Sequence, residues 1–426
     1  MKKILRRAAT SVALIVVVAA GLRVWMTRNY VEARPRQALG TLPFLFESGN
    51  IAHSVAAGEG FASPFRARTG PTAWMTPVYP LLLAGVIREF GAYTFPAYLG
   101  AVALNIWFSS LACVPIFYVG RRVGGEAVGA TAAWLWAIFP NANLQTFESL
   151  WDASLDALLG AGILWATLTM EEKERRARDW CAYGLLWGLA LMTNAAFAGL
   201  LPFFLGWIGW RKWKRGERWV GRAAAALVVM AACCAPWTAR NYRVFHAFVP
   251  LRSVMGLQLW LGNNPGTTPL WLGTQHPIFN TEEREKYVEM GEIAYMREKR
   301  EEAIAYAGAN PGRVAELTWR RFLTVWSGGT AYPVRDFLER RGAWFRYVML
   351  FNVAAGVGAL GGIILLWRRR SEFAFPLAAG PVVYPAPYYL TLVEPRYRLP
   401  VDPMVMLLGA VVLVAVAGGI AKRRKG

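Results

Sequence analysis

Residues 41–83, TLPFLFESGNIAHSVAAGEGFASPFRARTGPTAWMTPVYPLLL, are the stretch around which the chain is organised. Leu45, Ile51 and Val55 recur at roughly helical spacing, and the same run carries one acid, Glu47. A Gly/Ser/Pro-rich segment follows and predicts a hairpin, after which a Pro-bracketed apolar helix begins. These features predict a structured loop that follows the first apolar segment. Its acid, Glu47, lies on an amphipathic helix.

The composition predicts an all-α polytopic membrane protein. Of the 426 residues, 55% are hydrophobic and only 17% are charged, whereas soluble domains carry about a quarter charged residues. Apolar runs long enough to cross a bilayer recur along the whole chain. We predict about ten transmembrane helices. Their approximate ranges are 8–26, 96–119, 126–140, 148–170, 180–193, 195–210, 219–237, 345–367, 373–392 and 401–420.

The net charge of +20 is carried by clusters at the ends of apolar segments. The clusters are 2–7, 121–122, 175–178, 211–218, 368–370 and 422–425. This is the positive-inside pattern of membrane proteins, so membrane lipids are the expected surroundings and nucleic acid is not an expected partner. Placing every cluster in the cytoplasm leaves no crossing for the apolar helix at 76–90. We therefore predict a juxtamembrane or re-entrant helix there.

Placing the basic clusters in the cytoplasm also assigns a side of the membrane to each loop, and this divides the chain into three parts. These are an N-terminal transmembrane module at 1–237 with a first outer loop at 28–95, a large outer loop at 238–342, and C-terminal transmembrane helices at 343–426. The large loop is predicted to be mostly helical. Asn280 and Glu283 form a capping-box-like start, the helix must end before Pro311, and a second helix covers about 313–326.

Acids gather at the outer end of one predicted span. Glu148, Asp152 and Asp156 are spaced i, i+4 and i+8, which aligns them on one helix face. An acidic stripe of this kind suits a general base or a bound cation. The alternatives are favourable interaction with the helix dipole or pairing with a basic group. Glu47 is a second candidate base, and His53, one to two turns further on, is interpreted as a surface histidine.

Arginines at the predicted outer interface run against the positive-inside rule. They are Arg240, Arg243, Arg252, Arg396 and Arg398. Binding a lipid phosphate or diphosphate would explain them, and interfacial snorkelling is the alternative. Asn263 either binds a sugar or forms a turn.

Several familiar site types are not indicated. The sequence has no Walker loop, HExxH, Ser-His-Asp order or dinucleotide glycine pattern. The four cysteines lie in apolar segments, so we predict neither a disulfide framework nor a zinc site. The lack of a phosphate-cradling loop fits a donor that is not a soluble nucleotide.

The ordered set of motifs resembles the GT-C type integral-membrane glycosyltransferases. The nearest branch includes protein mannosyltransferases and the aminoarabinose transferase acting on lipid A. The resemblance covers essentially the whole chain in layout. It is carried by TPVYPLLLAGVIREFG (76–91), YVGRRVGG (118–125), Pro140 followed by Asp152, PWTARNY (236–242) and RYRLP (396–400).

The resemblance implies transfer of a sugar from a polyprenyl-phosphate carrier to a lipid, glycan or protein acceptor, with inversion at the anomeric carbon. It implies a bacterial inner membrane with the active face periplasmic. Glu47 would be the general base and Asp152 or Glu148 the second acid. Arg396 or Arg240 would hold the carrier phosphate. The resemblance leaves a divalent metal open, and we assign no residue to one.

One departure from the family pattern concerns the base. The family usually has Asp or Asp-Glu about three residues before the position of Glu47, where this chain has Phe44 and Leu45. Either the acid has moved in this subfamily, or Asp152 is the base, or activity is lost. The other function classes are a transporter or flippase of lipid-linked glycans and a non-catalytic envelope-assembly protein. A transporter would place its polar groups near mid-membrane.

Overall fold

The computed structural model describes residues 10–172, 175–269, 273–339 and 342–423. Within these ranges every regular element is a helix, which confirms the all-α prediction. The basic cluster at 2–7 and the last residues of the cluster at 422–425 lie outside the described residues.

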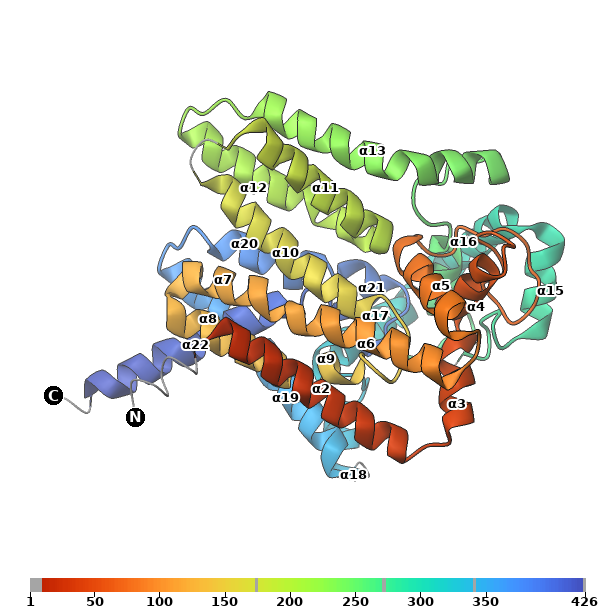
Figure 1. The fold of residues 1–426 in the computed structure, drawn as a ribbon, viewed down its shortest axis with the longest axis horizontal. Coiled ribbons are helices and arrows are strands. Elements are labelled where there is room, and N and C mark those ends of the chain that lie inside the picture. Colours follow the sequence, from red (N-terminus) through yellow and green to blue (C-terminus); the bar gives the residue numbers. More distant parts are fainter. Residues whose placement is uncertain (1–9, 173–174, 270–272, 340–341, 424–426) are drawn as a thin grey trace.

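In the described part of the chain, eleven helices form an elongated bundle (Figure 1). They are α2 (Val12–Glu32), α6 (Phe95–Leu111), α7 (Cys113–Gly124), α8 (Glu126–Ile138), α10 (Ala153–Glu171), α11 (Ala177–Thr193), α12 (Leu201–Lys214), α13 (Val220–Phe245), α19 (Ala343–Arg368), α20 (Ala374–Val383) and α22 (Asp402–Arg423). Shorter helices connect them. These are α3 (Arg36–Thr41), η1 (Leu42–Leu45), α4 (Glu47–Ala56), α5 (Val78–Phe90), α9 (Pro140–Leu144), η2 (Ala195–Gly199), α14 (Met255–Gly262), α15 (Thr281–Met290), α16 (Glu292–Ala309), α17 (Pro311–Ser327), α18 (Pro333–Glu339), α21 (Ala386–Leu390) and η3 (Pro395–Arg398).

Within the described residues, six helical segments are long and apolar enough to cross a membrane: α2, the continuous pair α6–α7, α10, α13, α19 and α22. The other four predicted spans coincide with α8, α11, α12 and α20–α21, which are shorter. Close backbone packing holds the short helices in the bundle. A Cβ on Gly120 of α7 would lie 2.6 Å from the Cα of Gly129 of α8, an approach that only small residues allow. Because these four helices are shorter than a typical span, the number of membrane crossings, about ten, stays a prediction.

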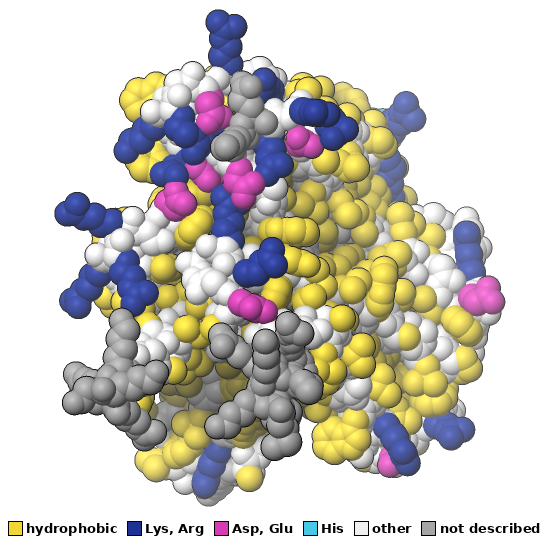
Figure 2. All heavy atoms as spheres, turned by 60° about the vertical axis from the view of Figure 1, so that its left-hand side comes forward, with side chains coloured by type: hydrophobic (Ala, Val, Ile, Leu, Met, Phe, Trp, Pro, Cys, Tyr) yellow, Lys and Arg dark blue, Asp and Glu magenta, His cyan; other side chains and the backbone are white. Residues whose placement is uncertain are grey.

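The predicted cytoplasmic clusters at 121–122, 175–178, 211–218 and 368–370 lie at one end of the bundle, where α2 begins and α22 ends (Figure 1). Glu171, at the end of α10, accepts hydrogen bonds from Arg122 at 3.3 Å, from Arg211 at 3.0 Å and from Arg215 at 2.5 Å. These arginines come from two other helix ends. Figure 2 brings this end forward and shows Lys and Arg interspersed with acids beside broad apolar surface. The clustering of these charges at one end agrees with the prediction that the basic clusters lie on one side of the membrane.

The opposite end carries α3 to α5 together with α15 and α16 (Figure 1). Tyr79, Leu83 and Ile87 of α5 are buried in one core with Ala52 of α4, so α5 packs on the first loop as a short helix at the end of the bundle. The predicted hairpin is present between these helices. Its backbone pairs are Ser63 N–H to Gly70 O at 2.8 Å and Thr72 N–H to Phe61 O at 3.1 Å.

The large loop is helical, with one more break than predicted. Asn280 caps α15 as expected, its side chain accepting from Glu283 N–H at 3.0 Å. The helix then ends at Gly291, whose φ of 75° lies in the left-handed region, where glycine has no Cβ penalty. The prediction of one continuous helix from Asn280 toward Pro311 is therefore wrong. A separate helix, α16, begins directly after this glycine.

Candidate active site

A cavity of about 670 Å³ lies where the first loop, the start of α10, the large loop and the segment before α22 meet. Its lining combines acids, two arginines, one histidine and aromatic rings. The ionisable lining residues are Glu47, Glu148, Asp152, Asp156, Arg252, His276, Tyr388, Glu394, Arg396 and Tyr397. Parts of the chain that are hundreds of residues apart thus contribute to one polar chamber.

Glu47 is the first residue of α4, where the free backbone N–H groups of the helix favour a negative charge. The preceding 3₁₀ turn folds back tightly, and a Cβ on Gly49 would lie 2.2 Å from the Phe44 carbonyl oxygen. Asn50 fixes this turn through its amide, which donates at 3.1 Å to Leu45 O and to Pro64 O. The turn therefore directs the buried carboxylate of Glu47 into the cavity.

Asp152 precedes the first residue of α10 and lines the same cavity. Ser48, next to Glu47, donates its hydroxyl to Leu150 O at 2.7 Å and so ties α4 to the segment that carries Asp152. One turn further on, Asp156 accepts from Asn194 Nδ2 at 2.7 Å. The two acids that sequence reasoning left as alternative bases are brought to one chamber, and Glu148 lines it as well.

Two of the five predicted phosphate-binding arginines line the cavity. Arg252 donates from Nε to Trp74 O at 3.0 Å, which leaves the rest of its guanidinium for other partners. Arg396 pairs with Glu394 at 2.5 Å and lies over the ring of Trp151, 4.1 Å from its centroid. Both cations are half-buried. A phosphate in the cavity would therefore meet fixed, partly desolvated positive charge.

The charge state of Glu47 is set by its surroundings. Burial raises the pKa of Glu47 to about 7; the nearby cations Arg396 and Arg252 oppose this rise, and the acid Glu394 adds to it. A carboxylate with this pKa is a better proton acceptor near neutral pH than an ordinary Glu.

If Glu47 is the base, the rate of any reaction it catalyses should rise with pH through about 7. The carboxylate must be unprotonated to accept a proton, so kcat should be about tenfold lower at pH 6 than at pH 8. A pH profile of kcat in detergent or nanodiscs checks this. A profile that is flat from pH 5 to 8 would contradict it.

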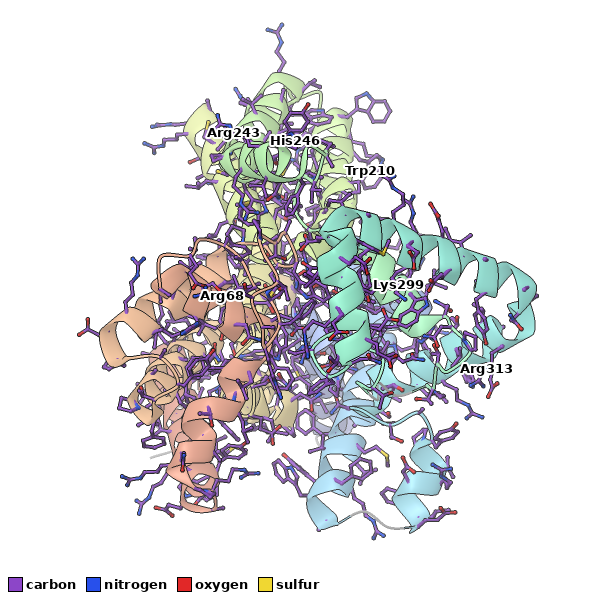
Figure 3. The ribbon with its side chains drawn as sticks, turned by 90° about the vertical axis from the view of Figure 1, so that its right-hand side faces the viewer. Arg68, Trp210, Arg243, His246, Lys299 and Arg313 are labelled. Atoms are coloured by element: carbon purple, nitrogen blue, oxygen red, sulfur yellow. The ribbon has the colours of Figure 1, made fainter. Side chains whose placement is uncertain are left out.

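The other four predicted binding residues do not line the described cavity. Arg240 donates at 2.7 Å to both Thr72 O and Phe61 O, so it holds the hairpin. Arg243 is exposed near the end of α13, close to His246 (Figure 3). Asn263 donates at 2.9 Å to Leu259 O and at 2.8 Å to Leu390 O. These contacts favour structural or surface roles.

Arg398, the fourth of these residues, is buried in a polar cluster inside the bundle. It contacts Asp402 at 2.5 Å, Val325 O at 2.9 Å and Asn352 Oδ1 at 2.7 Å. Removing one member of a buried ion pair leaves the other charge uncompensated, which typically costs about 3–5 kcal/mol.

We therefore expect Arg398→Met to destabilise the protein by about 3–5 kcal/mol, measured as a lower midpoint of unfolding in detergent. The double variant Arg398→Met/Asp402→Leu should recover much of this loss, because it removes both charges. A single variant with the stability of the native chain would contradict the structural role.

Sequence reasoning missed His276 of the large loop and Tyr388 of α21, which both line the cavity. His276 Nε2 lies 3.2 Å from Glu47 Oε1, and Tyr388 stacks on Tyr397 with centroids 4.7 Å apart. No local motif surrounds His276, and its proximity to Glu47 arises only from tertiary folding. Across the described part of the chain, no three His, Cys, Asp or Glu side chains are grouped as metal ligands.

Comparisons with known proteins place the fold. Residues 74–239 match the family model described as dolichyl-phosphate-mannose-protein mannosyltransferase. The oligosaccharyltransferase AglB of Archaeoglobus fulgidus, solved with an inhibitory peptide and a dolichol-phosphate, superposes with a TM-score of 0.56 at 14% identity. That superposition covers 97% of this chain. The chain has a GT-C fold.

Two further comparisons give the share of each chain that is covered. An oligosaccharyltransferase of Archaeoglobus fulgidus in complex with Zn and sulfate gives a TM-score of 0.54 at 14% identity, over 96% of this chain and 50% of that one. The chain therefore spans about half the length of the archaeal oligosaccharyltransferase. ArnT from Cupriavidus metallidurans, bound to undecaprenyl phosphate, gives a TM-score of 0.41 at 15% identity, over 95% of this chain and 78% of that one. No curated protein sequence matches the chain.

Proposed function

We propose that this chain is an integral-membrane glycosyltransferase that moves a sugar from a polyprenyl-phosphate donor to an acceptor at the outer membrane face. The observation that carries the proposal is the single cavity in which Glu47 and Asp152 meet Arg252 and Arg396. The mannosyltransferase family match and the GT-C fold support the same reaction class. The acceptor is a lipid, a glycan or a protein.

The proposed mechanism uses the chain's own side chains. Glu47 accepts the proton of the acceptor nucleophile as that nucleophile bonds to the anomeric carbon. The bond between this carbon and the phosphate oxygen breaks at the same time, with inversion, and polyprenyl phosphate leaves. Arg252 and Arg396 stabilise the negative charge that develops on the leaving phosphate. Asp152 assists as the second acid.

The location of the cavity supports an extracytoplasmic reaction. It lies among α4, the start of α10 and the large loop, at the end of the bundle away from the basic clusters (Figure 1). Positive-inside logic assigns that end to the outer face. We propose a bacterial inner membrane with the active face periplasmic, where a lipid-linked donor supplies the activated sugar and no soluble nucleotide is required.

The deciding experiment incubates purified protein with a panel of polyprenyl-phosphate sugars and a membrane-extract acceptor fraction, and follows release of free polyprenyl phosphate. Release by the native chain, and none by heat-inactivated protein, is the expected result. A panel that yields no release, in an assay where a GT-C enzyme of known activity works, would contradict the proposed function.

A further inference from the structure

The large outer loop brings an imidazole to the candidate base. His276 Nε2 lies 3.2 Å from Glu47 Oε1, and both side chains are 8% exposed. The two residues come from the first and the large outer loops, and both line the cavity. A contact between a histidine and a buried carboxylate has two forms, because the imidazole is either a neutral donor or a cation.

The hydrogen bonds of the ring decide between these forms. Ile278 donates its backbone N–H to Nδ1 of His276 at 3.2 Å, so Nδ1 carries a lone pair and Nε2 carries the proton. Burial lowers the pKa of His276 to about 3, which keeps the ring neutral across the working range. The Nε2–H group therefore lies within hydrogen-bonding distance of Glu47 Oε1, 3.2 Å away.

The ring is held rigidly by its surroundings. Trp74 and Phe65 meet it edge to face, with centroids 5.4 and 6.0 Å away. The turn that carries it is closed by the His276 carbonyl, which accepts from the N–H groups of Phe279 and Asn280, both at 2.9 Å. The imidazole is thus fixed from both the first loop and the large loop.

We propose that His276 is a positioning residue of the cavity, whose Nε2–H holds Glu47 Oε1 so that Oε2 faces the acceptor. This inference rests on the proposed function. A hydrogen bond to one carboxylate oxygen fixes the side-chain rotamer and stabilises the charged form. It leaves the other oxygen as the proton acceptor. A base built this way requires the large loop to be seated over the first one.

Three substitutions separate positioning from packing. In His276→Gln the side-chain amide nitrogen occupies roughly the place of Nε2 and can still donate to Glu47. His276→Asn offers its oxygen near the place of Nδ1, where it can accept from Ile278 but does not reach Glu47. His276→Phe keeps the ring volume and loses both bonds.

The first readout needs no substrate. The ionisation of Glu47 is followed by infrared difference spectroscopy, with the band assigned by its loss in Glu47→Gln. The other charged groups facing Glu47 are Asp152, Arg252, Glu394 and Arg396, and all are kept. In the Asn and Phe variants the pKa of Glu47 should rise by about one unit, because a donor to the charged form is lost. In the Gln variant it should stay within a few tenths.

The second readout is activity. With the native chain active, the Asn and Phe variants should lose about tenfold in kcat with donor KM unchanged, and the Gln variant should retain most of kcat. Equal behaviour of Gln and Asn, or an unshifted Glu47 pKa in the Phe variant, would overturn the positioning role. An inactive native chain that still shows the pKa shift would instead count against the proposed function and leave the hydrogen bond standing.

Discussion

Glu47→Gln is expected to lower kcat for sugar transfer by about 10³-fold, within the range that a general base contributes. The amide has the size of the carboxyl group but cannot accept the acceptor's proton. Glu47 is buried at the start of α4 and lines the cavity. Binding of polyprenyl phosphate should change little, because the phosphate is proposed to contact the arginines.

The matched control is Glu59→Gln, in the same outer loop. Glu59 pairs with the exposed Arg68 at 2.8 Å and its side chain is 37% exposed, so its loss should leave transfer within twofold. Single-turnover kinetics with a defined donor would separate chemistry from product release. Full activity in Glu47→Gln together with a large loss in Asp152→Asn would assign the base to Asp152.

Arg396→Gln is expected to weaken binding of the donor phosphate about 10- to 100-fold, the range for losing a hydrogen bond between charged groups. A second effect arises from Glu47. Arg396 lowers the pKa of Glu47 and Glu394 raises it, so removing the cation should move the pH profile of kcat upward. The affinity is measured directly by titrating the detergent-solubilised protein with polyprenyl phosphate.

Arg243→Gln is the matched control for this experiment. Arg243 is exposed on α13 (Figure 3) and was among the arginines that the sequence offered as candidates for phosphate binding. Its replacement should change affinity by less than twofold. Equal losses in the two variants would show that general electrostatic attraction, and not the cavity, accounts for the effect.

The fold was predictable where a pattern is local. Apolar runs located the helices, basic clusters located one end of the bundle, and Asn280 with Glu283 located the start of α15. The break at Gly291 was missed because a single glycine within a helical pattern also occurs in continuous helices. Lengths were less predictable. α13 extends to Phe245, beyond the predicted end near residue 237, because its last turns are polar.

The site was predictable only in part, for a physical reason. Glu47 and Asp152 stood out because acids are rare near apolar segments. The arginines were harder to rank, since each was unusual at an outer interface. The structure separates them by their partners: Arg240 holds backbone carbonyls, whereas Arg396 lines the cavity. The sequence drew attention to His53, which faces Tyr93 at 5.0 Å between ring centroids, while His276 reaches Glu47.

Glu292 accepts from the hydroxyl of Thr72 at 2.5 Å and from the N–H of Ala73 at 2.8 Å, across 220 positions of sequence. This pair joins the hairpin of the first loop to the large loop. A ribosome adds about 5–20 residues per second, so the first loop waits roughly 10 to 40 seconds for this partner during synthesis. Until then its buried polar groups must be hydrated or bound by a chaperone. The hairpin therefore reaches its final set of contacts only after the large loop has been synthesised.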